Sequence, residues 1–305
     1  MVTASAEQST QFLQTIEVIS NWLSHQLNDE QVAWLTQKRS ELLKEATQRS
    51  FFIAFSLVPR RLGKANWIST SEDLKIATEL CPGWQPQNWR IDQLARTFLV
   101  LSLIQGNPES AQGILDQLFS AADIDELVAL YQTLPLLPKP EQYQDRAAEG
   151  IRTNMSVVFK AVALDNPYPS QYLSEGAWNQ MVLKAIFIDC PLYDIMGLDD
   201  HTNPTLSQIL LDYAHERWAA GRRVTPELWR AMGALTTDEM SEDLQRVLDD
   251  SDPKQQIAGA ITCSKSNSQK VQSLLESRPE LKLIAQQQTW ETWTQKYLSS
   301  NSVNL

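Results

Sequence analysis

Apolar residues recur at intervals of three and four along almost the whole chain, and sustained alternation of apolar and polar residues is hard to find. The first spacing places apolar side chains on one face of a helix, whereas alternation is typical of a strand. Only 10 of the 305 residues are glycine, which destabilises the interior of a helix. The pattern therefore predicts an all-α protein, in which short turns join an antiparallel helical array or a HEAT-like α-solenoid.

Proline and glycine mark the boundaries of the expected helices. A capping residue stands before a proline, as in the first turn of many helices, at residues 107–108, 203–204, 225–226 and 252–253. Gly106 and Gly221 stand where helices are expected to end. The spacing predicts helices over residues 9–27, 29–57, 71–80, 89–105, 108–119, 124–133, 141–164, 175–189, 204–220, 226–234, 237–249, 253–263, 267–277 and 279–299. For the last of these the alternative is a break near Gln288.

No strong linker divides the chain. The proline-rich segment 134–140 is the best candidate for a boundary, and it separates an N-terminal helical region, 1–138, from the core helices. We expect those core helices to cover 139–235. The C-terminal helices, 236–305, contain the small residues Ala258, Gly259 and Ala260, which let a neighbouring helix approach closely, as in a HEAT-type pair. The alternative is one continuous solenoid domain.

Charge and cysteine usage exclude several classes of protein. Lysine and arginine number 26 and aspartate and glutamate 37, so the formal net charge is −11, which argues against binding to nucleic acid or to anionic lipid. No apolar run reaches the roughly 18 residues of a membrane span, and residues 1–10 do not resemble a signal peptide. The three cysteines are far apart and predict reduced thiols. We therefore expect a cytoplasmic protein with no integral membrane segment.

Polar side chains stand on otherwise apolar helix faces in residues 150–232. The expected helix 175–189 is apolar almost all round, which predicts burial, and Glu175, Asn179 and Lys184 are among its exceptions. A buried polar group needs a partner. Asn179 therefore either joins two helices by hydrogen bonds or contacts a ligand, and Lys184 either extends its ammonium group to solvent or holds an anion.

Two further helices of this segment carry similar exceptions. On the expected helix 141–164, Asn154 falls among apolar residues. Like Asn179, it either joins two helices by hydrogen bonds or contacts a ligand. On the expected helix 204–220, Arg217 falls inside the apolar stripe. It is either a structural arginine, with Glu175 as one possible carboxylate partner, or an anchor for a ligand.

Signatures of catalysis are scarce. Asp212 and His215 stand one helical turn apart, where both side chains can reach one metal ion, but no further ligands converge on them in the sequence. The motifs of serine hydrolases, dinucleotide- and phosphate-binding loops and zinc proteases are absent. Cys190 precedes a proline in an apolar context, which predicts a buried structural thiol. We expect no catalytic residue, no metal and no cofactor.

A stiff loop with two prolines, residues 165–169, joins two of these helices. The side chain of Asn166 is expected to cap or close a turn there. The loop is expected to expose Tyr168, which suits either packing against the protein or recognition of a partner.

Long sequence runs within 150–232 resemble the EboA family. In order, these runs cover residues 163–169, 176–185, 197–199, 203–204, 212–222 and 226–230. The resemblance implies a protein encoded with a bacterial gene cluster of secondary metabolism, including export or processing of pigment precursors. It implies partners among the products of that cluster, namely a UbiA-like prenyltransferase, a metal-dependent hydrolase and a cyclase-like enzyme, and it implies no particular reaction.

Two main functional hypotheses follow. The first is a non-catalytic helical adaptor that binds a partner protein or a hydrophobic metabolite on the 150–232 surface. The second is an enzyme acting on a small metabolite, with Glu175, Asp212 or His215 as acid or base. A weaker third is a purely structural subunit of another enzyme. The residues expected at the binding surface are Asn154, Tyr168, Glu175, Trp178, Asn179, Lys184, Asp212, His215, Arg217 and Trp218.

Overall fold

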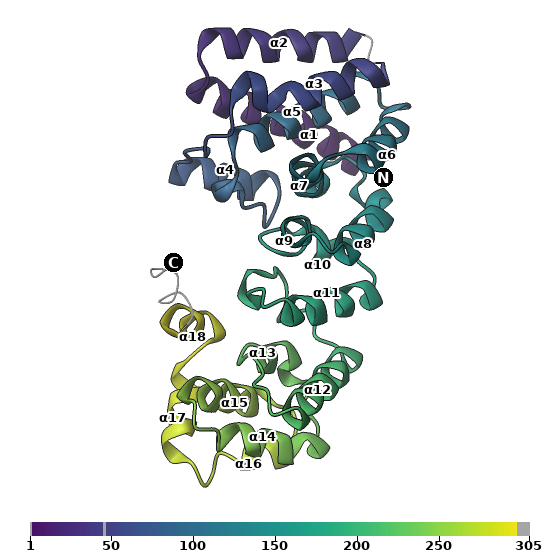
Figure 1. The fold of residues 1–305 in the computed structure, drawn as a ribbon. Coiled ribbons are helices and arrows are strands. Elements are labelled where there is room, and N and C mark those ends of the chain that lie inside the picture. The colour runs from purple at the N-terminus through teal and green to yellow at the C-terminus, as the bar shows by residue number, and fades with distance from the viewer. Residues whose placement is uncertain (1, 45–46, 298–305) are drawn as a thin grey trace. The chain divides into compact units, whose positions relative to one another are not determined.

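The computed structural model describes residues 2–44 and 47–297 (Figure 1). This part of the chain holds eighteen α-helices and six short 3-10 helices, and its single β-bridge joins Asn66 to Arg90. The predicted all-α class is confirmed, whereas the HEAT-like solenoid stays a prediction. None of the described helices is both long and apolar enough to cross a membrane.

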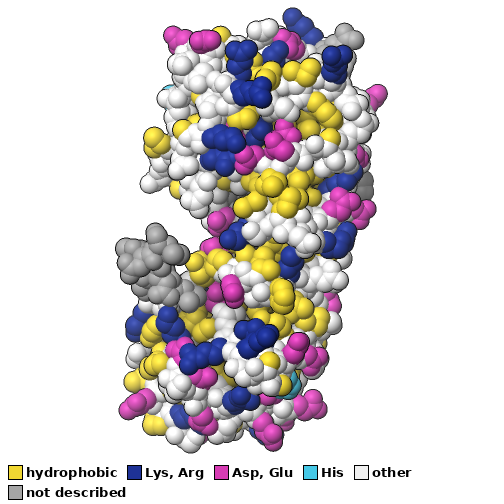
Figure 2. Space-filling model, in the orientation of Figure 1, with side chains coloured by type: hydrophobic (Ala, Val, Ile, Leu, Met, Phe, Trp, Pro, Cys, Tyr) yellow, Lys and Arg dark blue, Asp and Glu magenta, His cyan; other side chains and the backbone are white. Residues whose placement is uncertain are grey.

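Acidic and basic side chains are interspersed on the face of the molecule drawn in Figure 2.

The chain forms two compact units, residues 1–174 and 175–305. The segment 134–140, where the sequence predicts a boundary, lies within the first unit. Compact units are not necessarily folding domains, so the three predicted domains stay a prediction.

The first unit is built around α5 (Ile91–Gly106). This helix is apolar on most of its circumference and is buried from Ile91 to Leu103, which is expected of a helix enclosed by others. It packs against α1, α2, α3 and α7. The other helices of the unit are α1 (Val2–Gln26), α2 (Asp29–Lys44), α3 (Gln48–Leu62), α4 (Ser71–Leu80), α6 (Ala111–Ala121), α7 (Ile124–Thr133), α8 (Gln144–Arg152), α9 (Ser156–Ala163) and α10 (Tyr168–Tyr172).

Two buried charges on α5 neutralise each other. The guanidinium of Arg96 lies 2.9 Å from the carboxylate of Asp92, and both side chains are almost completely buried. Arg90 bonds the same carboxylate at 2.8 Å and reaches Asp125 of α7 at 3.0 Å. A buried charge is tolerated only when it is paired and hydrogen-bonded. The network therefore fixes how α5 lies against α7.

The second unit is built around α15 (Pro253–Lys265), which is buried from Ile257 to Cys263 and packs against α13, α14 and α17. A side chain at Gly259 would place its Cβ only 2.7 Å from Cγ1 of Val247, so the predicted close approach at the small residues is confirmed. The remaining helices are α11 (Glu175–Phe187), α12 (Pro204–Ala219), α13 (Leu228–Met232), α14 (Ser241–Leu248), α16 (Gln269–Ser273), α17 (Pro279–Gln287) and α18 (Trp290–Tyr297).

Three predicted helices are interrupted. The expected helix 279–299 is divided into α17 and α18 at Gln288, the alternative break expected for it. The expected helix 29–57 is interrupted, because Thr47 and Ser50 form a capping box that starts α3. The expected helix 141–164 is divided into a 3-10 turn, α8 and α9. Thr153 is extended and its hydroxyl accepts a hydrogen bond from the backbone N–H of Met155 at 3.3 Å, which competes with the helical pattern. Asn154 consequently lies in an exposed loop and not on a helix face.

The predicted helix starts are correct at two of four prolines. Asn203 caps α12 by accepting from the N–H of Leu206 at 2.8 Å, and Asp252 caps α15 by accepting from Lys254. Pro108 and Pro226 instead open turns, and the following helices begin only at Ala111 and Leu228.

Candidate functional site

Asn179 and Trp178 of α11 are buried and take part in the packing of the second unit. The Asn179 amide forms two hydrogen bonds with the Asn203 amide, which itself caps α12. The structure thus contains the inter-helix hydrogen bond that was one interpretation of Asn179. The Trp178 ring lies 5.1 Å from that of His201, measured between ring centroids.

The expectation that Tyr168 is exposed is wrong. Its side chain is completely buried, and its hydroxyl donates to the carbonyl of Pro140 at 2.6 Å. Burial raises the pKa of this phenol above its usual range. The predicted turn at Asn166 is confirmed, because its side-chain oxygen accepts from the N–H of Tyr168 at 2.9 Å while its amide donates to the carbonyl of Ala161. Tyr168 therefore serves packing.

The proposed acid–base residues lie on the surface, and two of them, Asp212 and His215, bond to different partners. Glu175 is exposed at the start of α11. Asp212 accepts from the Gln208 amide at 2.8 Å, whereas His215 lies 2.7 Å from Asp243 of α14. Among the described residues, no group of three histidine, cysteine or acidic side chains is placed to hold a metal ion.

Arg217 and Lys184 are both half-buried. Arg217 donates from Nε to the carbonyl of Arg223 at 3.1 Å, and within the described chain it makes no ion pair with Glu175 or another carboxylate. Its role in the structure is to hold the loop after α12. Burial lowers the pKa of Lys184 below its usual range. The predicted burial of the Cys190 thiol is confirmed.

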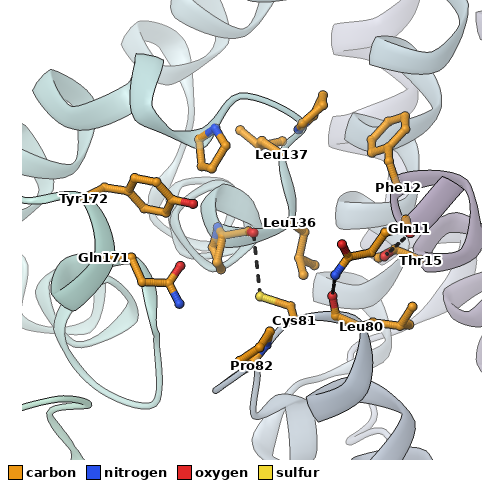
Figure 3. Close-up of a pocket in the computed structure, with 13 residues that line it drawn as sticks. Gln11, Phe12, Thr15, Leu80, Cys81, Pro82, Leu136, Leu137, Gln171 and Tyr172 are labelled. Carbon is orange, nitrogen blue, oxygen red and sulfur yellow. Dashed lines mark hydrogen bonds between the residues drawn. The ribbon is translucent and has the colours of Figure 1, made fainter. Parts of the chain in front are cut away.

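A hollow of about 190 Å³ lies in the first unit (Figure 3). We name it the proline hollow. It is lined by Gln11, Phe12 and Thr15 of α1, Leu80, Cys81 and Pro82 at the end of α4, residues 135–138 and Pro140, and Gln171 and Tyr172 of α10. None of these thirteen lining residues has an acidic or basic side chain. Four prolines in the lining offer ring surface and carbonyl groups but no N–H donors.

The titratable groups of the proline hollow are held in their neutral forms. Burial raises the pKa of the Cys81 thiol to about 11, and this thiol donates a weak hydrogen bond to the carbonyl of Pro135 at 3.7 Å. Burial also raises the pKa of Tyr172. In Figure 3 the Tyr172 side chain reaches into the space from α10, and Gln11 and Thr15 face it from α1. The hollow is thus polar but uncharged.

Sequence reasoning missed this hollow because its residues come from four segments that are distant in the chain. The proline-rich segment 134–140 was the one signal, and we interpreted it as a boundary. Of the ten predicted site residues, none lines the proline hollow. Trp218 lines a second hollow, in the second unit.

Glu227 is a buried titratable group that the spacing of apolar residues does not reveal. Its carboxyl is buried in the second unit and accepts from the N–H of Tyr193 at 2.8 Å. Burial raises its pKa to about 7, so this group titrates near neutral pH.

Comparison with known proteins agrees with the resemblance found in the sequence. A family model described as metabolite traffic protein EboA matches residues 15–233. The chain belongs to the EboA family. The EboA match extends well beyond the runs of residues 150–232 and covers most of the proline hollow, from Thr15 to Tyr172. No curated protein and no solved structure matches the chain significantly.

Proposed function

We propose that this EboA protein binds a small, uncharged metabolite in the proline hollow and passes it on unchanged. The observation that carries the proposal is the lining itself: amide, hydroxyl and carbonyl groups among prolines and leucines, without an acidic or basic side chain. A charged ligand would lose its hydration there and gain no counter-ion. A neutral ligand would exchange its hydrogen bonds to water for hydrogen bonds to the lining, and it would bury its apolar surface.

The size of the hollow limits the ligand. Its volume of about 190 Å³ is below the roughly 300–1,000 Å³ of typical ligand sites. It therefore suits a compact molecule, or one end of a longer molecule whose remainder stays in solvent.

The state of the titratable groups favours binding over catalysis. A general acid or base works best when its pKa lies near the working pH. Burial moves the pKa of Cys81 to about 11 and raises that of Tyr172, so both groups stay protonated at neutral pH. The acid or base candidates of the enzyme hypothesis, Glu175, Asp212 and His215, line neither of the two hollows described above.

The family description, metabolite traffic, supports a role in transfer. Proteins of the same gene cluster, among them the UbiA-like prenyltransferase, the metal-dependent hydrolase and the cyclase-like enzyme, stay the proposed partners. The proposal also includes a partner surface on residues 150–232, a cytoplasmic location and a place in bacterial secondary metabolism.

Isothermal titration calorimetry with naphthylmethanol, a neutral aromatic alcohol, tests the proposal. We expect saturable binding to the wild type and at least tenfold weaker binding to Gln171→Phe, because the added ring occupies the hollow from an exposed position on α10. The control is Gln144→Phe, the same substitution at an exposed position of α8 outside the hollow. No saturable binding, or equal affinity for both folded variants, would overturn the proposal.

A further inference from the structure

A second hollow, of about 220 Å³, lies in the second unit between the end of α12, the following loop and α14. We name it the arginine pocket; its lining includes Trp218, Arg222, Arg223, Arg246, Asp250 and Gln255. Three arginines and one aspartate thus line one small space. It is independent of the proline hollow, from which it differs in unit and in charge.

The wall of the arginine pocket is rigid. Trp218 stacks on the buried ring of Trp229, with centroids 5.9 Å apart and planes 25° from parallel. The indole N–H of Trp229 donates to Gln255 at 2.8 Å, and the Gln255 amide donates to the carbonyl of Val224 at 2.6 Å. A buried hydrogen-bonded chain therefore holds the tryptophan platform and the loop together.

The platform also orders one of the arginines. The Arg246 guanidinium carbon lies 4.3 Å from the centroid of the Trp218 ring, within the range of a cation–π interaction. An arginine held in this way keeps its N–H groups free to bind in the plane of the guanidinium. Ordering before binding lowers the entropic cost of association.

The loop that carries the other two arginines is fixed at both ends. Gly221 adopts φ +67°, a left-handed conformation that glycine allows, and its N–H donates to the carbonyl of Trp218 at 3.0 Å. The N–H of Arg222 donates to the carbonyl of Arg217, whose side chain in turn donates to the carbonyl of Arg223. Arg217 thus acts on the arginine pocket by positioning this loop.

The charges in the arginine pocket are not balanced. Within the described chain, none of Arg222, Arg223 and Arg246 forms an ion pair with a carboxylate. Asp250 accepts from the N–H of Asp252 at 2.8 Å. Three positive charges against one negative charge leave an excess of two, on a protein whose formal net charge is −11.

We propose that the arginine pocket binds an organic phosphate. A phosphate monoester carries about −1.5 to −2 charges at neutral pH, which matches the excess of two, whereas a carboxylate carries one. Guanidinium groups bind phosphate oxygens in pairs of hydrogen bonds. The apolar part of the ligand would lie against Trp218 and Val247, which line the same space.

Isothermal titration calorimetry with phenyl phosphate tests this assignment. We expect phenyl phosphate to bind at least tenfold more tightly than benzoate, and more tightly than inorganic phosphate, which lacks the ring. The double variant Arg222→Gln/Arg223→Gln should weaken binding at least tenfold. The control is Arg60→Gln/Arg61→Gln, which changes two adjacent exposed arginines at the end of α3 by the same chemistry.

Three results would overturn the proposal. These are no binding of phenyl phosphate at millimolar concentration, benzoate binding as tight as that of phenyl phosphate, or equal losses in the two double variants. Circular dichroism of both variants establishes that they fold. A Trp218→Phe variant gives a second readout, because the change in tryptophan fluorescence on binding should shrink when Trp218 is the residue beside the ligand.

Discussion

The side-chain amides of Asn179 and Asn203 bond to each other in both directions. Nδ2 of Asn179 donates to Oδ1 of Asn203 at 3.2 Å, and Nδ2 of Asn203 donates to Oδ1 of Asn179 at 2.8 Å. The same oxygen of Asn203 accepts from the N–H of Leu206 at the start of α12. One buried residue of α11 therefore orients the group that caps α12.

This pair predicts that Asn179→Ala destabilises the protein by about 1–3 kcal/mol, because the Asn203 amide loses its buried partner. Urea denaturation gives the free energy of unfolding. Asn154→Ala is the control, and at its exposed loop position it should change that free energy by less than about 0.5 kcal/mol. Similar values for the two variants would contradict a structural role of the pair.

Gly150 of α8 is predicted to tolerate no side chain. A Cβ there would lie 2.7 Å from Cζ of Tyr131 and from Cγ2 of Val162, so Gly150→Ala should lower stability by about 1–3 kcal/mol. Gly113, in the exposed part of α6, has nothing within 4 Å of such a Cβ. Gly113→Ala should therefore raise stability by about 0.5–1 kcal/mol through helix propensity. If Gly150→Ala and Gly113→Ala shift the melting temperature in the same direction, this prediction is wrong.

Glu227 should make stability depend on pH. Its pKa is raised from 4.5 to about 7 in the folded protein, so the folded state binds the proton more tightly than the unfolded state. The contribution of Glu227 to the free energy of unfolding is fully present below about pH 4.5 and is lost as the pH rises towards 7. The loss is about 3 kcal/mol.

Comparison with Glu227→Gln isolates this effect from other carboxyl groups. The glutamine side chain stays neutral and keeps an oxygen that can accept from the N–H of Tyr193. The stability of the wild type relative to the variant should therefore fall between pH 4.5 and 7. A constant difference across this range would show that Glu227 does not titrate there.

The helical period predicted the all-α class and the presence of a helix at α5 correctly, because both depend on local spacing. The break after α8 was missed, since Thr153 interrupts the helix through a side-chain bond that apolar spacing does not reveal. Tyr168 was expected to be exposed because it stands between two prolines. In the structure it is buried, and its hydroxyl donates to the carbonyl of Pro140, 28 residues away in the chain.

The candidate sites were less predictable than the fold. The proline hollow combines Thr15, Cys81 and Tyr172 with the 135–138 segment, and no local pattern links residues so far apart. In the arginine pocket, Trp218 was a predicted site residue. Its partner Arg246 stands on another helix, α14, outside residues 150–232. Helical projection identifies which residues share a face, but it does not show which helices meet.

The central claim is that the proline hollow selects uncharged ligands, and a matched series of naphthalene compounds tests it most directly. Affinities of naphthylmethanol, naphthoate and naphthylmethylammonium should be measured by calorimetry in the Arg222→Gln/Arg223→Gln background, which weakens the arginine pocket. We predict that the neutral alcohol binds at least tenfold more tightly than either ion, a difference of about 1.4 kcal/mol. Equal or tighter binding of either ion would contradict the account.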